Sequence, residues 1–187
     1  MQIRKADWFI RTKLMKPFYG KLGKHSYVGP TLFVERRSGL FIGNNVRIYP
    51  NLRVELPTKS SLIEIKDNVS IGQNFHIVSY NKKLIIPEGT VISANVFISN
   101  VNHDYKKIGI DALKQNMISK DTILGENCFI GYGAVILPGT RLGKQCIVGA
   151  NAVVSGIFDD YSVIAGVPAR TIKKYNPITN KWEKVNV

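Results

Sequence analysis

The chain has 187 residues, of which 44% are hydrophobic and 21% charged, and its formal net charge is +13. This length suits one buried core and is short for two ordinary domains, and no apolar run reaches the roughly 18 residues that span a bilayer. Much of the excess positive charge lies in residues 1–24 and 170–187. A nucleic-acid-binding protein usually spreads basic residues over a docking face. The distribution instead favours an anionic small ligand or a membrane surface, and we expect no nucleic-acid partner.

The N-terminal segment, residues 1–24, is predicted to cap the fold. Within residues 3–18, four apolar residues recur at near-helical spacing among basic ones: Ile3, Ile10, Leu14 and Phe18. This pattern predicts a short basic amphipathic helix whose length Pro17 limits. Two interpretations stay open, because such a helix can pack on the first repeat or dock on a membrane surface. The segment does not resemble a signal peptide, so we expect a cytoplasmic protein, with the inner face of the membrane as a second location.

A six-residue repeat runs through residues 25–155. Aliphatic residues recur at this spacing in an unbroken series: Ile118, Leu124, Ile130, Ile136, Leu142, Val148 and Val154. The fifth place of each hexad is small: Thr122, Cys128, Ala134, Thr140, Cys146 and Ala152. The same frame appears upstream, with breaks in phase, at Val28, Val34, Ile42, Ile48, Val54, Ile65, Ile71, Ile77, Ile86, Ile92 and Ile98. A period of six is neither the 3.6 of a helix nor the 2 of a strand.

This period predicts a β-helix, because six residues fit a short strand plus a corner. Three hexads would close one triangular coil, and stacked coils would pair their strands in parallel with the aliphatic residues inside. Unpaired edges would remain only at the two ends, so residues 1–24 and 156–187 are the predicted caps. Cys128 and Cys146 both occupy inward positions, and we expect reduced core residues there rather than a disulfide.

One long interruption breaks the repeat between Ile98 and Ile118. This stretch has no hexad pattern, and we predict an excursion loop over residues 102–117. A long loop that interrupts a regular solenoid is more often functional than accidental. His103 lies at its start.

Four stretches carry a resemblance to a known family: SIGQNFHI at 70–77, ISANVFISNVNHDY at 92–105, CFIGYGAVILPG at 128–139 and YSVIAGVPARTIKKY at 161–175. In order and spacing they resemble the hexapeptide-repeat acyltransferases, in particular the O-acetyltransferases of lipopolysaccharide and capsule synthesis and the galactoside, maltose and nodulation-factor group. The resemblance implies an all-β, left-handed parallel β-helix, acetyl-CoA as acyl donor, and a homotrimer whose active sites are shared between neighbouring copies. This handedness is an exception to the right-handed crossover rule.

His103 matches the catalytic histidine of this family. The resemblance implies direct transfer, with His103 as the general base that takes the proton of the acceptor hydroxyl. The other interpretation is a solvated loop histidine. Asp104 follows directly, and adjacent side chains on an extended backbone point apart, so it is a poor candidate to orient the ring. The sequence does not identify the orienting residue.

Further positions match cofactor and acceptor contacts of the family. The cofactor-matched residues are Tyr132, Ala150, Gly166, Pro168, Arg170 and Lys173. The resemblance places Tyr132 and Ala150 beside the pantetheine arm. It places Gly166 and Pro168 in a turn that closes the pocket, and the basic pair Arg170 and Lys173 near the phosphates. A solvated basic tail is the other interpretation of this pair. Gly156 stands where galactoside-type members carry Lys. Asn74 matches an acceptor contact or is a plain β-helix corner, and His76 is a second candidate to line the site.

The sequence therefore predicts an acetyl-CoA-dependent O-acetyltransferase that acts on a sugar hydroxyl of a cell-surface polysaccharide or its precursor. The alternative is an N-acetyltransferase of a nucleotide-linked amino sugar. A non-enzymatic assembly module would not need His103, Asn74 and the turn at Gly166 together. We expect no metal, because His25, His76 and His103 lack the close spacing of a zinc-ligating pair.

Overall fold

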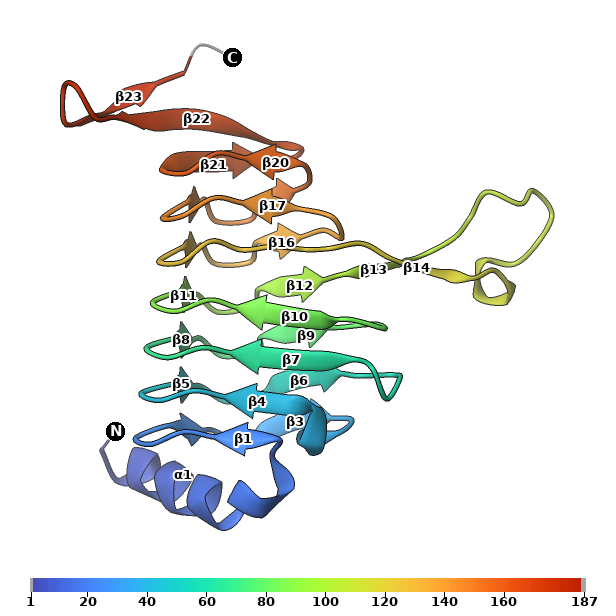
Figure 1. Ribbon diagram of the computed structural model, residues 1–187, viewed down its shortest axis with the longest axis vertical. Helices are drawn as coiled ribbons and strands as arrows, with labels where there is room; N and C mark the ends of the chain where they lie inside the picture. The colour runs from blue at the N-terminus through green and yellow to red at the C-terminus, as the bar shows by residue number, and fades with distance from the viewer. Residues whose placement is uncertain (1, 186–187) are drawn as a thin grey trace.

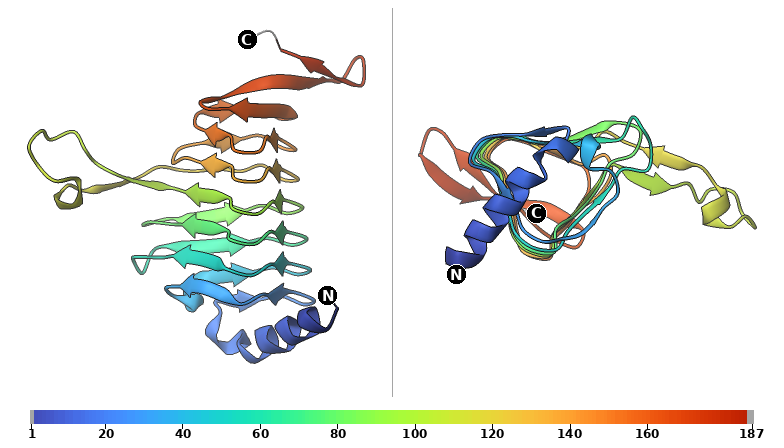
Figure 2. Two further views of the ribbon diagram at one scale, coloured as in Figure 1. Left: turned by 180° about the vertical axis from the view of Figure 1, so that it is seen from behind. Right: turned by 90° about the horizontal axis from the view of Figure 1, so that it is seen from below.

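The structure is a computed structural model that describes residues 2–185, with side chains from Lys5 onward. Met1, residues 186–187 and the side chain of Ile3, which belong to the predicted caps, lie outside the described residues. The chain winds into a triangular prism whose three faces are sheets (Figures 1 and 2). Within the described residues, no helix has the length and apolar character that a membrane span requires.

Three stacks of short strands form the faces. Face A contains β1 (Lys21–Leu22), β4 (Leu40–Ile42), β7 (Leu62–Ile65) and β10 (Lys83–Ile86), and the pair β17 (Arg141–Leu142) and β20 (Ile157–Phe158) continues it. Face B contains β2 (Tyr27–Val28), β5 (Arg47–Ile48), β8 (Ser70–Ile71), β11 (Val91–Ile92), β15 (Phe129–Ile130), β18 (Ile147–Val148) and β21 (Ser162–Gly166), followed by β22 (Ala169–Asn176) and β23 (Lys181–Lys184). Face C contains β3 (Thr31–Val34), β6 (Leu52–Glu55), β9 (His76–Val78), β12 (Phe97–Ser99), β16 (Val135–Ile136) and β19 (Val153–Val154).

Strands within each face pair in parallel as far as β21, and β22 and β23 then continue face B in antiparallel pairing. As the chain rises in Figure 1, the strands of face A run to the left in front and those of face C run to the right behind. This sense of winding is left-handed, which confirms the predicted fold class. The remaining elements are helix α1 (Gln2–Leu14), the 3₁₀ turns η1 (Lys16–Phe18), η2 (Arg37–Gly39) and η3 (Ala112–Lys114), and strands β13 (Val101–His103) and β14 (Met117–Ser119).

The inward positions of the repeat form one continuous core along the prism axis. Almost every predicted aliphatic position is buried, and so are all the predicted small positions from Thr122 to Ala152. Consecutive coils place identical positions in register, as Ile92 beside Ile71 and Ile130 shows. Two predicted positions differ. Val34 is half-buried, and Ile118 pairs with Asn102 in the β13–β14 hairpin, so the unbroken repeat starts at Leu124 rather than at Ile118.

The corner between faces B and C is built by asparagine. Asn51, Asn74 and Asn95 lie one above another with φ of 66°, 58° and 60°, a left-handed conformation that Asn tolerates better than most residues. Their amides form a ladder. Asn51 Nδ2 donates to Asn74 Oδ1 at 2.9 Å, and Asn74 Nδ2 donates to Asn95 Oδ1 at 2.7 Å. This ladder fixes the corner to which several predicted site residues belong.

The N-terminal end of the prism is closed by α1, which lies across the first coil (Figure 2). Trp8 packs against Tyr27 and Tyr49, with ring centroids 6.1 Å apart in both pairs. The Thr12 hydroxyl accepts from the N–H of Val28 at 2.8 Å and donates to the carbonyl of Trp8, one turn earlier in the helix, at 2.6 Å. The helix thus satisfies a backbone N–H of the first face B strand, β2, at the end of the prism where no further coil follows.

The packing predicts a sharp contrast between the two residues of β11. Ile92 points inward with 2% of its surface exposed, whereas Val91 points outward with 40% exposed. Ile92→Ala should lower the free energy of unfolding by about 2–5 kcal/mol, and Val91→Ala should change it by about 0.5 kcal/mol. Denaturant unfolding measures both values, and equal losses in the two variants would contradict the inward assignment.

Candidate active site

The excursion from the solenoid is a hairpin arm that starts directly after β12. Strands β13 and β14 pair antiparallel, with Val101 opposite Ser119 and His103 opposite Met117. The arm projects from the edge of face C that adjoins face A, well clear of the prism (Figures 1 and 2). At its far end, Gln115 accepts from the N–H of Lys107 at 3.0 Å and donates to the carbonyl of Ile110 at 2.9 Å. Paired strands thus hold the foot of the arm, and a single amide organises its tip.

His103 lies at the end of β13 with its side chain exposed to solvent. Among the side chains of residues 5–185, none forms a hydrogen bond with the imidazole of His103. The Asp104 carboxylate accepts from the N–H of Lys106 at 3.1 Å instead. The two ring nitrogens are therefore open to a substrate or to another molecule.

A second polar cluster lies on the outer surface of face C. His76 Nε2 is 2.9 Å from Glu55 Oε1, and Arg53 Nε donates to the same oxygen at 2.7 Å. The His76 ring packs edge-on against Phe97, with centroids 4.9 Å apart. Glu55 and Arg53 are not among the site residues predicted from the sequence. Aligning the hexads of consecutive coils, with Val54 beside Ile77, would have placed Arg53 next to His76 and indicated both residues.

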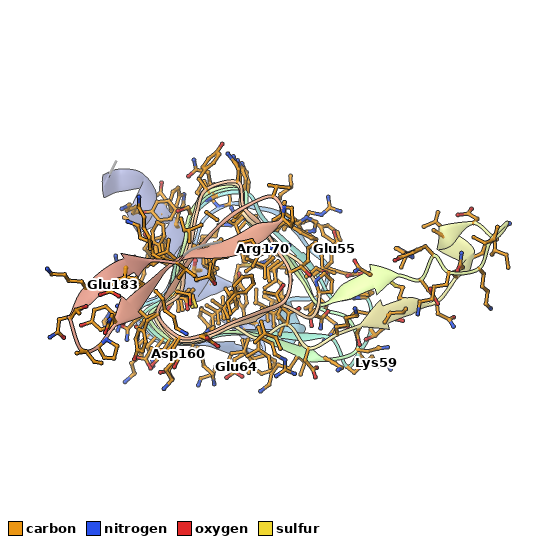
Figure 3. The ribbon with its side chains drawn as sticks, turned by 90° about the horizontal axis from the view of Figure 1, so that it is seen from above. Glu55, Lys59, Glu64, Asp160, Arg170 and Glu183 are labelled. Carbon is orange, nitrogen blue, oxygen red and sulfur yellow. The ribbon has the colours of Figure 1, made fainter. Side chains whose placement is uncertain are left out.

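The register relates this cluster to the foot of the arm. Glu55 pairs with Val78, and Val78 pairs with Ser99. Ser99 ends β12, and His103 ends β13, the next strand along the chain. With strands about 4.8 Å apart, Glu55 lies roughly 10 Å from Ser99 along the prism axis. In the view down the axis, Glu55 lies beside the base of the arm (Figure 3). His76, which pairs with Phe97, thus lies on the same face as the strand that leads to His103.

The residues matched to the pantetheine arm lie at the opposite edge of face C. Tyr132 and Ala150 are exposed on the corner between faces B and C, and the N–H of Asn151 donates to the carbonyl of Tyr132 at 2.7 Å. The Tyr132 hydroxyl accepts from Asn95 Nδ2, so the amide ladder connects Tyr132 to Asn74. The structure therefore groups these residues in one column, with the amide of Asn74 engaged by its neighbours in the ladder.

The turn at Gly166 continues this column at the C-terminal end. Gly166 pairs with Ala169 between β21 and β22, and its φ of 100° suits glycine. The N–H of Gly149, beside Ala150, donates to the carbonyl of Ile164 at 2.7 Å, so the turn follows Ala150 along the axis. Pro168 is exposed in this turn.

The two basic candidates lie on β22. Arg170 and Lys173 are both exposed, and Arg170 bonds to a protein group only through the carbonyl of its neighbour Ala169, at 2.9 Å, among the described residues. Arg170 lies on the side of the prism that Glu55 also occupies when viewed from above (Figure 3). Exposed cations beside a turn can hold phosphate groups, Arg by its fork and Lys as a point charge.

Face C separates the two groups of predicted residues within one chain. Strand β12 crosses face C between Asn95 at one edge and Asn100 at the other. His103 comes just after the edge at Asn100, whereas Tyr132 and Ala150 lie on the corner at Asn95. Five residues of nearly extended chain span about 16 Å. A single chain therefore presents the histidine and the cofactor-matched column at opposite edges of the same face.

The thiols lie apart from both groups. Cys128 and Cys146 are free and buried, as expected from their inward positions. The hydrogen-bonded contact with Cys146, together with burial, raises the pKa of the Cys128 thiol. A buried thiol with a raised pKa is a poor nucleophile. Within residues 2–185, no three His, Cys, Asp or Glu side chains cluster closely enough to hold a metal ion.

Comparison with known proteins shows the family of this chain. Residues 121–156 match the model described as bacterial transferase hexapeptide, six repeats. The chain is 33% identical over 159 residues to "Putative lipopolysaccharide biosynthesis O-acetyl transferase WbbJ" of Escherichia coli K12, covering 81% of this chain and 80% of that protein. The chain belongs to the hexapeptide-repeat acyltransferases. Membership in this family makes it a CoA-dependent acyltransferase, and the resemblance noted in the sequence is confirmed.

Solved structures of similar fold include two CoA complexes. One is AntD, an N-acyltransferase from Bacillus cereus, in complex with dTDP and 3-hydroxybutyryl-CoA, with a TM-score of 0.71, 22% identity and 90% coverage of each chain. The other is galactoside acetyltransferase in complex with coenzyme A, with a TM-score of 0.60, 24% identity and coverage of 95% of this chain and 78% of that one. At identities of 22% and 24%, these two solved structures share the fold of this hexapeptide-repeat acyltransferase and do not define its acceptor.

Proposed function

We propose that the protein is an acetyl-CoA-dependent O-acetyltransferase that acts on a sugar hydroxyl of a cell-surface polysaccharide or its precursor. The observation that carries this proposal is the exposed imidazole of His103 at the foot of the arm, which has no hydrogen-bond partner among the described side chains. The printed name of the Escherichia coli relative, which refers to lipopolysaccharide biosynthesis and O-acetyl transfer, supports the acceptor class. N-acylation of a nucleotide-linked amino sugar is the second candidate, because AntD shares the fold over 90% of both chains.

The proposed reaction is a direct transfer. A neutral His103 ring accepts the proton of the sugar hydroxyl while its oxygen attacks the thioester carbonyl. The tetrahedral intermediate collapses as the carbon–sulfur bond breaks, and the imidazolium returns the proton to the departing CoA thiolate. The burial of Cys128 and Cys146 supports a route without an acyl-cysteine intermediate.

The proposed cofactor position follows the corner between faces B and C. Tyr132 and Ala150 would border the pantetheine arm through their backbones, and the turn with Gly166 and Pro168 would close over it. Arg170 and Lys173 would hold the phosphates. The small exposed side chain of Ala150 supports this position, because it leaves the corner backbone accessible. Asn74 and His76 are proposed to border the acceptor, His76 with its ring held by Glu55.

The separation across face C supports a shared site. One chain places His103 and the cofactor column at opposite edges of the face, so a complete site needs the histidine of one copy beside the column of another. Closed cyclic symmetry generates such an arrangement, and a trimer suits a three-sided prism. We accordingly propose a homotrimer, located in the cytoplasm, where acyl-CoA donors are made.

The first functional prediction concerns His103. A general base typically contributes about 10²–10⁴-fold, so His103→Ala and His103→Asn should lower kcat on a hydroxyl acceptor by at least about a hundredfold. The melting temperature should stay near that of the parent, because the ring is exposed. His25→Ala is the matched control, since His25 is exposed on a corner near the N-terminal end. Thiol release from acetyl-CoA measures the rate, and more than about a tenth of parental activity in His103→Ala would reject the assignment.

The acceptor panel separates the two candidate reactions. It pairs each hydroxyl sugar or glycan fragment with an amino sugar, both free and nucleotide-linked. Turnover of hydroxyl acceptors supports O-acetylation. Turnover confined to nucleotide-linked amino sugars would replace the proposal with N-acetylation.

The second functional prediction concerns the basic pair on β22. Removing a charged hydrogen bond costs about 1.5–3 kcal/mol, so Arg170→Ala combined with Lys173→Ala should raise the KM for acetyl-CoA about tenfold to a hundredfold, with a smaller change in kcat. Lys181→Ala combined with Lys184→Ala removes the same charge from the neighbouring strand β23 and should leave KM unaltered. Equal KM values in the two double variants would identify Arg170 and Lys173 as solvated tail residues.

The third functional prediction concerns the oligomer. Light scattering should give about three times the chain mass of 20.9 kDa. At acetyl-CoA concentrations well below the raised KM, His103→Ala and the Arg170, Lys173 double variant are each expected to be weakly active. They should regain activity when unfolded together and refolded as mixed trimers. Complementation is expected because some shared sites then take an intact histidine and an intact basic pair from different copies. A fully active monomer, or mixed trimers without recovered activity, would rule out the shared site.

A further inference from the structure

The outer side of α1 is apolar at its centre and basic at its borders from Ile10 onward, and the exposed Asp7 precedes this stretch on the same side. The helix packs on the first coil through Trp8 and Thr12. The opposite side leaves Ile10, Leu14 and, in the following turn, Phe18 exposed by 59%, 73% and 60%. The amphipathic stripe expected from the sequence therefore points away from the core, and the cap does not use it.

Basic side chains flank this stripe. At about 100° per residue along a helix, Arg11 and Lys13 lie on either side of the line from Ile10 to Leu14, and Lys16 follows at its C-terminal end. All three are exposed. Asp7 is the only acidic residue among residues 1–24. We call Ile10, Arg11, Lys13, Leu14, Lys16 and Phe18 the cap surface.

A shallow hollow adjoins the cap surface at the same end of the prism. It encloses about 410 Å³ and is lined by Phe9, Leu22 and three lysines, Lys13, Lys16 and Lys24, among others. A lining that combines apolar side chains with three lysines suits an anionic headgroup and part of its acyl chain. The hollow therefore extends the chemistry of the cap surface rather than adding a different one.

We propose that the cap surface docks on an anionic lipid bilayer. Exposed apolar side chains on one side of a helix, flanked by Lys and Arg, are the pattern of helices that lie in the membrane interface. The anionic headgroups complement the basic border, and the apolar stripe enters the acyl region. A second copy of the chain is a poorer occupant, because a two-fold contact would bring like charges together. This inference rests on the structure of the cap and not on the transferase reaction.

Vesicle flotation tests the proposal with the full-length protein. The parent should float with vesicles of phosphatidylglycerol mixed with phosphatidylcholine, remain unbound to pure phosphatidylcholine, and dissociate as salt screens the charges. Ile10→Ser combined with Leu14→Ser should weaken binding at least about tenfold. Arg11→Gln, Lys13→Gln and Lys16→Gln together should weaken it about fivefold for each charge. Melting temperatures should stay close to that of the parent, since these side chains are exposed.

Matched controls lie elsewhere on the chain. Ile157→Ser combined with Ile178→Ser removes two aliphatic residues that are 76% and 90% exposed. Lys106→Gln, Lys107→Gln and Lys114→Gln remove three exposed charges from the arm. Both controls should bind like the parent. Three results would overturn the proposal: no flotation of the parent, equal loss in a control and its test variant, or unchanged binding after loss of Ile10 and Leu14. Assembly beyond the trimer, without flotation and lost in the variant with Ile10→Ser and Leu14→Ser, would assign the surface to a second copy instead.

Discussion

Parallel pairing between successive coils is the constraint on which the rest of the structure depends. Because each strand hydrogen-bonds to the equivalent strand of the next coil, every coil must repeat the same path and the same inward positions. The interior is narrow, so aliphatic residues alternate with small ones such as Ala134 and Ala152. Corners then recur in columns, which explains why Asn51, Asn74 and Asn95 bond to one another in a ladder.

The same columns position the candidate active site. A residue at a corner is aligned with the residues one coil above and below, so Tyr132, Ala150 and Gly166 form one line without belonging to one strand. The arm uses the other edge of face C, where an insertion can leave the solenoid and return between Asn100 and Lys120, whose backbones bond at 2.8 Å. A regular scaffold therefore carries both halves of the proposed site at a fixed separation.

The two ends of the prism solve the problem of unpaired edges in different ways. At the N-terminal end, helix α1 covers the first coil, and the hydroxyl of Thr12 accepts from the N–H of Val28. At the C-terminal end, the chain reverses at Gly166, and β22 covers β21 as an antiparallel strand. The helical cap needs only one of its sides for this task, which leaves the opposite side free for a different contact.

The hexad period by itself indicated a three-sided coil, because it places one inward aliphatic residue on each face. It also located the arm, since a stretch without the period cannot continue the core. Ile118 kept the period and still left the core, because antiparallel pairing with Asn102 outweighed a single aliphatic match. The sequence pointed to His103 and the cofactor-matched residues through local motifs. Only the tertiary structure placed them at opposite edges of face C, joined Glu55 to His76 and turned Ile10 and Leu14 outward, because these relations depend on which coils and faces meet in space.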